Sequence, residues 1–118
     1  MNERVQILHD SKVISSETYE YILRISDEIL NLEAFNVETE SSNMFWTHLS
    51  IAVQRALFGE QIDFIDEIII EQIEESENID EINYKIRKIE DLIGKEFSRA
   101  ERGYISLHLG NLLGENSD

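Results

Sequence analysis

Cysteine and proline are both absent from the sequence, and glycine occurs only five times. Without cysteine the chain has no disulfide, no thiolate metal site and no cysteine nucleophile, a composition that suits a reducing compartment. Without proline, no residue forces a helix to break. Isoleucine, leucine, glutamate and aspartate dominate instead, and together they favour helices joined by short connections. We therefore expect an all-α protein.

Positive charge is scarce as well, since 10 basic residues stand against 25 acidic ones and give a formal net charge of −15. Such a surface repels nucleic-acid phosphates and anionic lipid headgroups, so we expect no direct binding to nucleic acid or to a membrane. A basic protein partner would be attracted instead. Long apolar runs are also missing, because no stretch approaches the roughly 20 residues of a membrane helix, and the start MNERV lacks a signal-peptide pattern. These features predict a cytoplasmic protein.

The length of 118 residues fits a single domain, residues 1–118, with 1–14 as a lead-in and 115–118 as a flexible tail. Apolar residues recur at helical spacing along five segments, and a short additional helix is predicted over 2–10. We expect a compact five-helix bundle. Its helices are predicted over 15–34, 43–58, 61–76, 81–93 and 98–114.

The last of these segments carries start, face and stop signals together. Ser98 and Glu101 form a capping box, in which the serine side chain accepts from the Glu101 amide and the carboxylate reaches back to the cap. Gly114 is predicted to end the helix. One apolar stripe contains a histidine and consists of Tyr104, Ile105, His108, Leu109 and Leu112.

A second histidine, His48, lies in the helix predicted over 43–58. Arg55 follows it by seven residues, on the same face but about 10.5 Å along the axis, so an anion between the two would fit better than direct pairing. Glu101 precedes His108 by seven residues and Tyr104 precedes it by four, so Tyr104 can flank the imidazole. From the residues alone, each histidine is either a packing residue or a chemical site.

The remaining motifs offer little chemistry. The sequence has no HExxH, no Walker loop, no GxGxxG and no GxSxG, so we expect neither an enzyme nor a cofactor site. A metal site using His48, His108 and a carboxylate lacks any supporting ligand spacing. His9, next to Asp10, is interpreted as an exposed polar residue near a turn. A basic cluster is interpreted as surface charge that pairs with nearby acids, namely Lys85, Arg87 and Lys88 with Glu81, Glu90 and Asp91.

Taken together, the two histidine segments resemble the PTS regulation domain (PRD), the five-helix module of bacterial transcriptional antiterminators and activators controlled by the sugar phosphotransferase system. The lead-in VISSETYEYI is similar to the first helix of that family. The first family motif stands here as His48, Leu49, Ala52 and Arg55. The second stands as Glu101, Gly103, Tyr104, Ile105, Leu107, His108 and Leu109.

This resemblance implies that His108 and His48 are phosphoacceptors, with Arg55, Glu101 and Tyr104 in supporting roles. It implies a donor that is the histidine phosphocarrier protein or an enzyme II component, a homodimer, and a switch in transcriptional control. His108 has the more intact motif, because Thr47 stands where many family members have an aspartate before the first histidine. The alternative is a helical binding or scaffold domain whose histidines only pack.

Overall fold

The computed structural model describes residues 3–60 and 64–116, and all regular structure within these ranges is helical. The all-α prediction is confirmed. The helices are α1 (Glu3–Asp10), α2 (Ser16–Glu28), α3 (Glu33–Asn36), α4 (Glu40–Phe58), α5 (Glu67–Glu74), α6 (Ile79–Ile93) and α7 (Arg99–Asn116). The predicted five helices correspond to α2, α4, α5, α6 and α7, α1 is the additional N-terminal helix, and α3 is a single turn. None of the described helices is long and apolar enough to cross a membrane.

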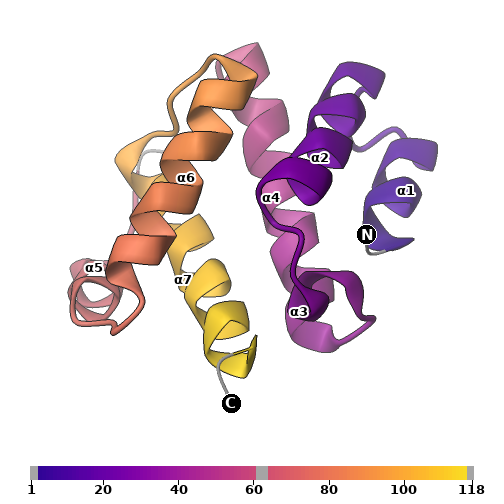
Figure 1. Ribbon diagram of the computed structural model, residues 1–118. Helices are drawn as coiled ribbons and strands as arrows, with labels where there is room; N and C mark the ends of the chain where they lie inside the picture. The colour runs from indigo at the N-terminus through magenta and orange to yellow at the C-terminus, as the bar shows by residue number, and fades with distance from the viewer. Residues whose placement is uncertain (1–2, 61–63, 117–118) are drawn as a thin grey trace.

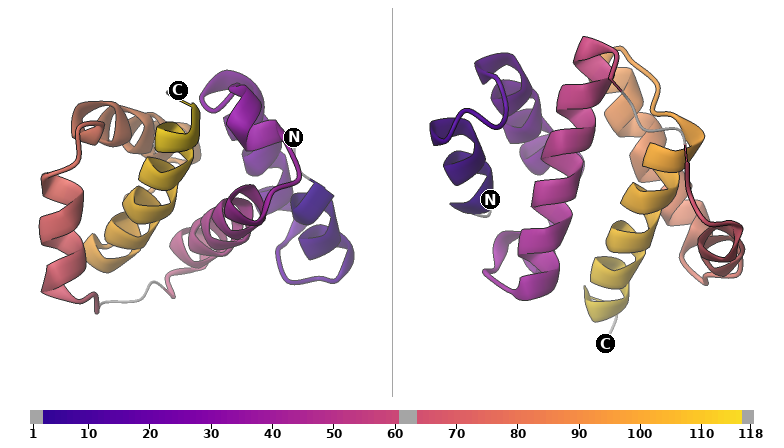
Figure 2. Two further views of the ribbon diagram at one scale, coloured as in Figure 1. Left: turned by 90° about the horizontal axis from the view of Figure 1, so that it is seen from below. Right: turned by 180° about the vertical axis from the view of Figure 1, so that it is seen from behind.

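Helices α4 and α7 lie side by side and antiparallel at the centre of the molecule (Figure 1). We call the contact between them the α4–α7 seam. Helices α1 and α2 pack against α4 on one side, and α5 and α6 pack against α7 on the other (Figure 2). The turn α3 contacts both central helices, and α2 also touches α6. Both central helices therefore have packing partners on their outer sides.

An aromatic cluster fixes the start of α4 in the core. The rings of Phe35, Phe45 and Trp46 meet edge to face, with centroids 5.2 to 6.4 Å apart. The Trp46 indole N–H donates to the Phe35 carbonyl at 2.6 Å, which gives its buried polar atom a partner. At the other side of α4, the Gln54 amide oxygen accepts from the Ser15 backbone N–H at 2.9 Å. These contacts place α4 relative to α2 and α3.

Two predicted helix boundaries are wrong at the α2–α4 connection. Helix α2 ends at Glu28 rather than running to 34, and the chain then turns so that Leu30 and Phe35 are both fully buried. Helix α4 begins at Glu40 rather than at 43, because the side chain of Thr39 caps it by accepting from the Ser42 N–H at 3.1 Å. Tertiary burial overrides the continuous helical pattern here.

Further boundaries differ in the second half of the chain, where α6 begins at Ile79 rather than at 81. Helix α5 covers only Glu67–Glu74 of the predicted 61–76, with 64–66 irregular and 61–63 outside the described residues. Gly114 does not end α7, since the helix continues to Asn116 and reaches into the predicted tail. The glycines that do end helices are Gly59 and Gly94, which adopt φ of 75° and 73°. Gly114 is absent from the positive-φ glycines, so it lacks the left-handed conformation of a C-cap.

Gly103 allows α5 and the segment before it to approach α7 closely. A Cβ atom at this position would overlap the Cδ1 atom of Ile65 and lie 3.1 Å from that of Ile70. The glycine therefore leaves space for two isoleucine side chains at the α5–α7 contact, which is a packing reason for its place in the second motif.

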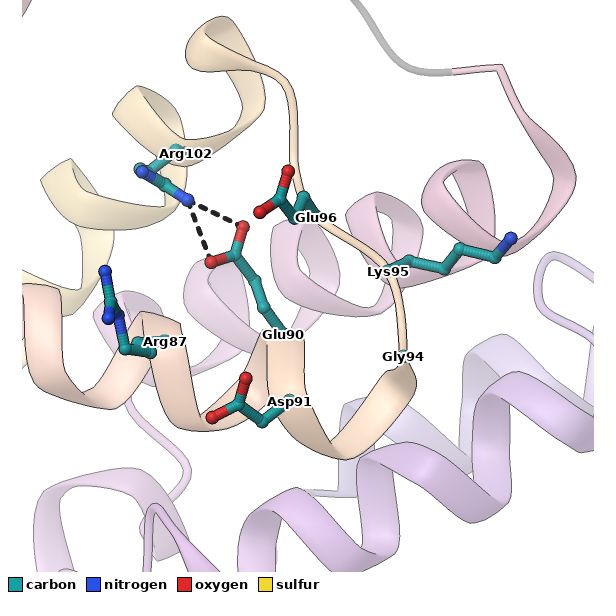
Figure 3. A pocket seen from close by; sticks show the side chains of 7 residues that line it. All are labelled: Arg87, Glu90, Asp91, Gly94, Lys95, Glu96 and Arg102. Carbon is teal, nitrogen blue, oxygen red and sulfur yellow. Dashed lines mark hydrogen bonds and ion pairs between the residues drawn. The ribbon is translucent and has the colours of Figure 1, made fainter.

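The corner between α6 and α7 is fixed by Glu90, a carboxylate that is 9% exposed. It accepts from the Phe97 backbone N–H at 2.8 Å, and both of its oxygens accept from Arg102 at 2.8 Å. Figure 3 shows the Glu90 carboxylate turned towards Arg102, while Lys95 extends away from it. The interpretation of Glu90 as a surface charge is wrong, although the pairing of Lys85 with Glu81 at 3.9 Å agrees with the prediction.

Candidate functional site

The α4–α7 seam brings His48 and His108 into direct contact. Their imidazole rings stack with centroids 4.4 Å apart and planes 11° from parallel. His108 is half-buried, whereas His48 is exposed. No hydrogen bond within the described residues engages either ring. Among the residues that the structure describes, the nitrogens of both rings therefore have no hydrogen-bond partner.

The two imidazoles are held in their neutral form. Burial lowers the pKa of His48 below its ordinary value of 6.5, and the positive charge of Arg55 lowers this pKa further. Burial also lowers the pKa of His108, and the neighbouring His48 acts in the same direction. A lowered pKa leaves an unprotonated nitrogen near pH 7, and this lone pair is what makes a histidine nucleophilic.

Two helical turns along the seam, Arg55 and Glu101 form an ion pair. The Arg55 Nη1 atom lies 3.2 Å from Glu101 Oε1. The Glu101 side chain is 3% exposed, and its second oxygen, Oε2, is buried without a hydrogen-bond partner among residues 3–60 and 64–116. Burial raises the pKa of Glu101, although the charge of Arg55 and its hydrogen bond oppose that shift. This carboxylate is therefore only partly satisfied.

One relation in the sequence accounts for both contacts. Arg55 follows His48 by seven residues and Glu101 precedes His108 by seven, so in antiparallel helices the second pair meets two turns from the first. The contact between Arg55 and Glu101 was not predicted, because each interval by itself relates only residues of one helix. The matched intervals in opposite directions are the signal that could have found it.

The other predicted supporting features are placed as follows. The Ser98 side chain accepts from the Glu101 N–H at 3.1 Å, which confirms this half of the capping box. The other half is wrong, because the Glu101 carboxylate contacts Arg55 and does not reach back to the cap. Tyr104 is partly buried on α7, and no ring contact joins it to either imidazole in the described part of the chain. Its role in flanking His108 stays a prediction. The Thr47 hydroxyl donates to the Asn43 carbonyl at 2.8 Å within α4, so it is engaged away from His48.

His9 is more engaged than the sequence analysis expected. Its ring stacks on Tyr19 with centroids 4.4 Å apart, and its Nε2 atom lies 3.1 Å from the Ser16 hydroxyl. The interpretation of His9 as a simple exposed residue is therefore corrected, because it ties α1 to the start of α2. It lies on α1, outside the α4–α7 seam.

Metal ligands are not clustered in the described residues, where no group of three or more His, Cys, Asp and Glu side chains is arranged to hold an ion. The stacked rings face one another with their planes nearly parallel. In-plane nitrogen lone pairs of such rings do not converge on a common point between them. The arrangement suits chemistry at one ring nitrogen better than chelation by both.

Comparison with known proteins gives one family. The model described as the PRD domain matches residues 16–112, a range that includes both histidines, Arg55, Glu101 and Tyr104. No curated protein and no solved structure gives a significant match. The resemblance seen in the two histidine motifs is thus confirmed, and the chain belongs to the PRD domain family, a family of regulatory domains.

Proposed function

We propose that this protein is a regulatory module of the sugar phosphotransferase system and that it is phosphorylated on His108 and His48. The observation that carries the proposal is the stacking of the two family histidines at 4.4 Å on the α4–α7 seam, with His48 reaching the surface. Histidines that only pack would be expected to be deeply buried, separated and bonded to carbonyl groups. These two are together, partly accessible and free of protein hydrogen bonds among the described residues.

The reaction is a phosphoryl transfer between two imidazoles. A ring nitrogen of His108 or His48 attacks phosphorus on the phosphohistidine of the donor, and a new N–P bond forms as the donor's N–P bond breaks. The donor imidazole leaves with its electron pair and gains the proton that the acceptor ring loses from its other nitrogen. The lowered pKa values of both histidines keep the attacking nitrogen unprotonated.

The consequence of transfer is a change of charge at the centre of the domain. A phosphoryl group adds about −1.5 to −2 charge and three acceptor oxygens at pH 7. A dianionic group on one ring of the stacked pair would change the balance of charge and hydration where α4 packs against α7. The proposal is that α4 repacks against α7 in response, and that this repacking alters homodimerisation or partner binding in transcriptional control.

The donor is the histidine phosphocarrier protein or an enzyme II component, which places the module in the cytoplasm. A net charge of −15 favours a donor or output partner with a basic surface. Nucleic acid is not a direct partner in this proposal, because the same charge repels its phosphates.

The test is reconstitution with phosphoenolpyruvate, enzyme I and the phosphocarrier, followed by intact-protein mass measurement. We expect an acid-labile phosphoryl adduct on the protein without substitutions, and we expect the adduct to be lost in the His48→Gln, His108→Gln double variant. His9→Gln is the matched control, since it removes a stacked histidine from outside the seam, and it should retain the adduct. An absent adduct, or one that persists in the double variant, contradicts the proposal.

A further inference from the structure

The buried carboxylate of Glu101 is incompletely satisfied, and this feature is not explained by packing or helix capping. One oxygen contacts Arg55 at 3.2 Å, and the other is buried with no hydrogen-bond partner in the described part of the chain. An ionised carboxylate offers about four acceptor positions, and a buried one normally uses several of them. The contact with Glu101 therefore restrains the Arg55 guanidinium only weakly, and the Arg55 side chain is itself 39% exposed.

Arg55 is placed to reach the histidine pair. It lies on the His48 face of α4, about 10.5 Å along the axis on the C-terminal side. Side chains on a helix lean towards its N-terminus, which on α4 is the side where His48 lies, so the long Arg55 side chain can turn its guanidinium that way. Its charge is already felt there, because it contributes to the lowered pKa of His48. Its partial exposure leaves room for the guanidinium to move.

A phosphoryl group on His48 would compete strongly for this guanidinium. It carries up to twice the charge of a carboxylate and presents three acceptor oxygens, and it can accept two parallel hydrogen bonds from an arginine. Glu101 makes a single contact with Arg55, and burial destabilises the ionised form of its carboxylate.

We propose that Arg55 exchanges partners when His48 is phosphorylated. Its guanidinium then breaks the contact with Glu101 and binds the phosphoryl group. This inference rests on the proposed function and adds the residue that recognises the modification. Glu101, 3% exposed, then loses the one cation that the described residues bring to it, and it either takes up a proton or moves towards water. The signal is thereby passed two helical turns from the histidines to the N-terminal part of α7.

Glu90, on α6, supplies the contrast at the neighbouring contact between α6 and α7. Its carboxylate accepts from Phe97 and, through both oxygens, from Arg102, all at 2.8 Å. Arg102 therefore has a well-satisfied partner and should keep it when His48 is modified. The Arg102–Glu90 pair is the internal control for the exchange.

The experiment uses potassium phosphoramidate, a small phosphoryl donor that modifies accessible imidazoles without any phosphotransferase protein. The phosphoryl group passes to a ring nitrogen of His48 and ammonia leaves. The side-chain nuclear magnetic resonance signals of Arg55, Glu101, Arg102 and Glu90 are then compared before and after modification. We expect the Arg55 Nε–H signal to move and the Glu101 Cδ signal to shift towards that of a carboxylic acid, while the Arg102 and Glu90 signals stay in place.

Two variants make the result decisive. In Glu101→Gln, the competing carboxylate is removed, so the phosphoryl group should bind Arg55 more readily and the phosphohistidine should be longer-lived than in the unmodified sequence. In His48→Glu, which carries a carboxylate at the modified position without any reagent, the Glu101 signal should shift in the same direction but less far. The exchange is overturned if the Arg55 and Glu101 signals stay unchanged in the phosphorylated protein. If the reagent leaves His48 unmodified, unchanged signals in His48→Glu overturn it instead. Absence of enzymatic labelling, by contrast, counts against the proposed function alone.

Discussion

Two of the arginine–glutamate pairs that join α7 to its neighbours contain a buried acid, and these two differ in how completely that acid is satisfied. Glu90, on α6, accepts from a backbone N–H and from Arg102 through both oxygens, each at 2.8 Å. Glu101, on α7, has one contact with Arg55 at 3.2 Å and one oxygen without a partner, although it is the more deeply buried of the two. The better-buried acid is the less well-bonded one.

This difference separates a structural pair from one that can respond to a signal. A buried charge with all its acceptors used is expensive to disturb, because removing one partner leaves others unpaired. A buried charge with a single contact is already poorly stabilised, so breaking that contact costs comparatively little. A new anion nearby can therefore take its partner and change its protonation or position. Only the second kind of pair lies on the helix faces that carry the stacked histidines.

The largest expected effect comes from removing the well-bonded acid. Glu90→Ala should lower the free energy of unfolding by about 3 kcal/mol, because it leaves the buried Phe97 N–H unpaired and removes two charge-assisted hydrogen bonds. Urea denaturation followed by circular dichroism measures this directly. Asp91→Ala, at an exposed neighbouring position, is the matched control and should change stability by less than about 0.5 kcal/mol. A small loss in Glu90→Ala would remove the contrast between the two pairs.

Neutral isosteres should sharpen the contrast at lower cost. Glu101→Gln keeps an oxygen that accepts from Arg55 and removes the cost of a buried charge, so its unfolding free energy should stay within about 1 kcal/mol of the starting protein. Glu90→Gln should cost about 2 kcal/mol, since its amide nitrogen would face the Arg102 donor. Both are measured in the same urea series. Equal losses in the two variants would contradict the distinction.

The histidine pair should make stability fall on acidification. Both folded-state pKa values lie below 6.5, so the unfolded chain binds more protons than the folded one, and stability rises with pH through this window. The stability that is fully present above pH 6.5 is therefore lost as the pH falls towards the folded values. Thermal melts across this range should show the slope in the starting protein and a flatter one in the His48→Gln, His108→Gln variant. An unchanged slope would mean that the imidazoles are not held neutral by the seam.

Glu101 should contribute a slope of the opposite sign. Its folded-state pKa is raised above 4.5, so the folded chain binds more protons between the two values, and stability falls as the pH rises through that interval. Glu101→Gln should remove this contribution and make the melting temperature rise more steeply with pH just above 4.5. The measurement is the same set of thermal melts, and identical pH profiles for Glu101→Gln and the starting protein would contradict it.

Much of this arrangement could be predicted from local signals. Ser98 marks the start of α7, and Gly59 and Gly94 end α4 and α6 in the left-handed conformation, because capping depends on residues a few positions apart. The two histidine motifs likewise depend on spacing within one helix. Their contact requires only that α4 and α7 pack together, which the shared apolar stripes favour.

The features that were missed depend on partners distant in sequence. After α2 ends, Leu30 is buried and the Phe35 carbonyl accepts from the Trp46 indole N–H. No signal in the neighbouring sequence predicts either feature. Glu90 has the same sequence surroundings as a surface acid, yet Phe97 and Arg102 enclose it from the following loop and helix. Gly114 carries a stop signal that the helix passes through. Charge and helical spacing alone do not reveal which acids become buried.

The central claim is that the stacked histidines of the α4–α7 seam are the residues that take up phosphate. The most direct measurement is peptide mapping of the enzymatically phosphorylated protein by mass spectrometry at alkaline pH, where phosphohistidine survives. The account predicts the phosphoryl group on peptides that contain His108 or His48, and an unmodified His9 peptide in the same digest. A phosphoryl group confined to His9, or located on a residue other than histidine, would contradict it.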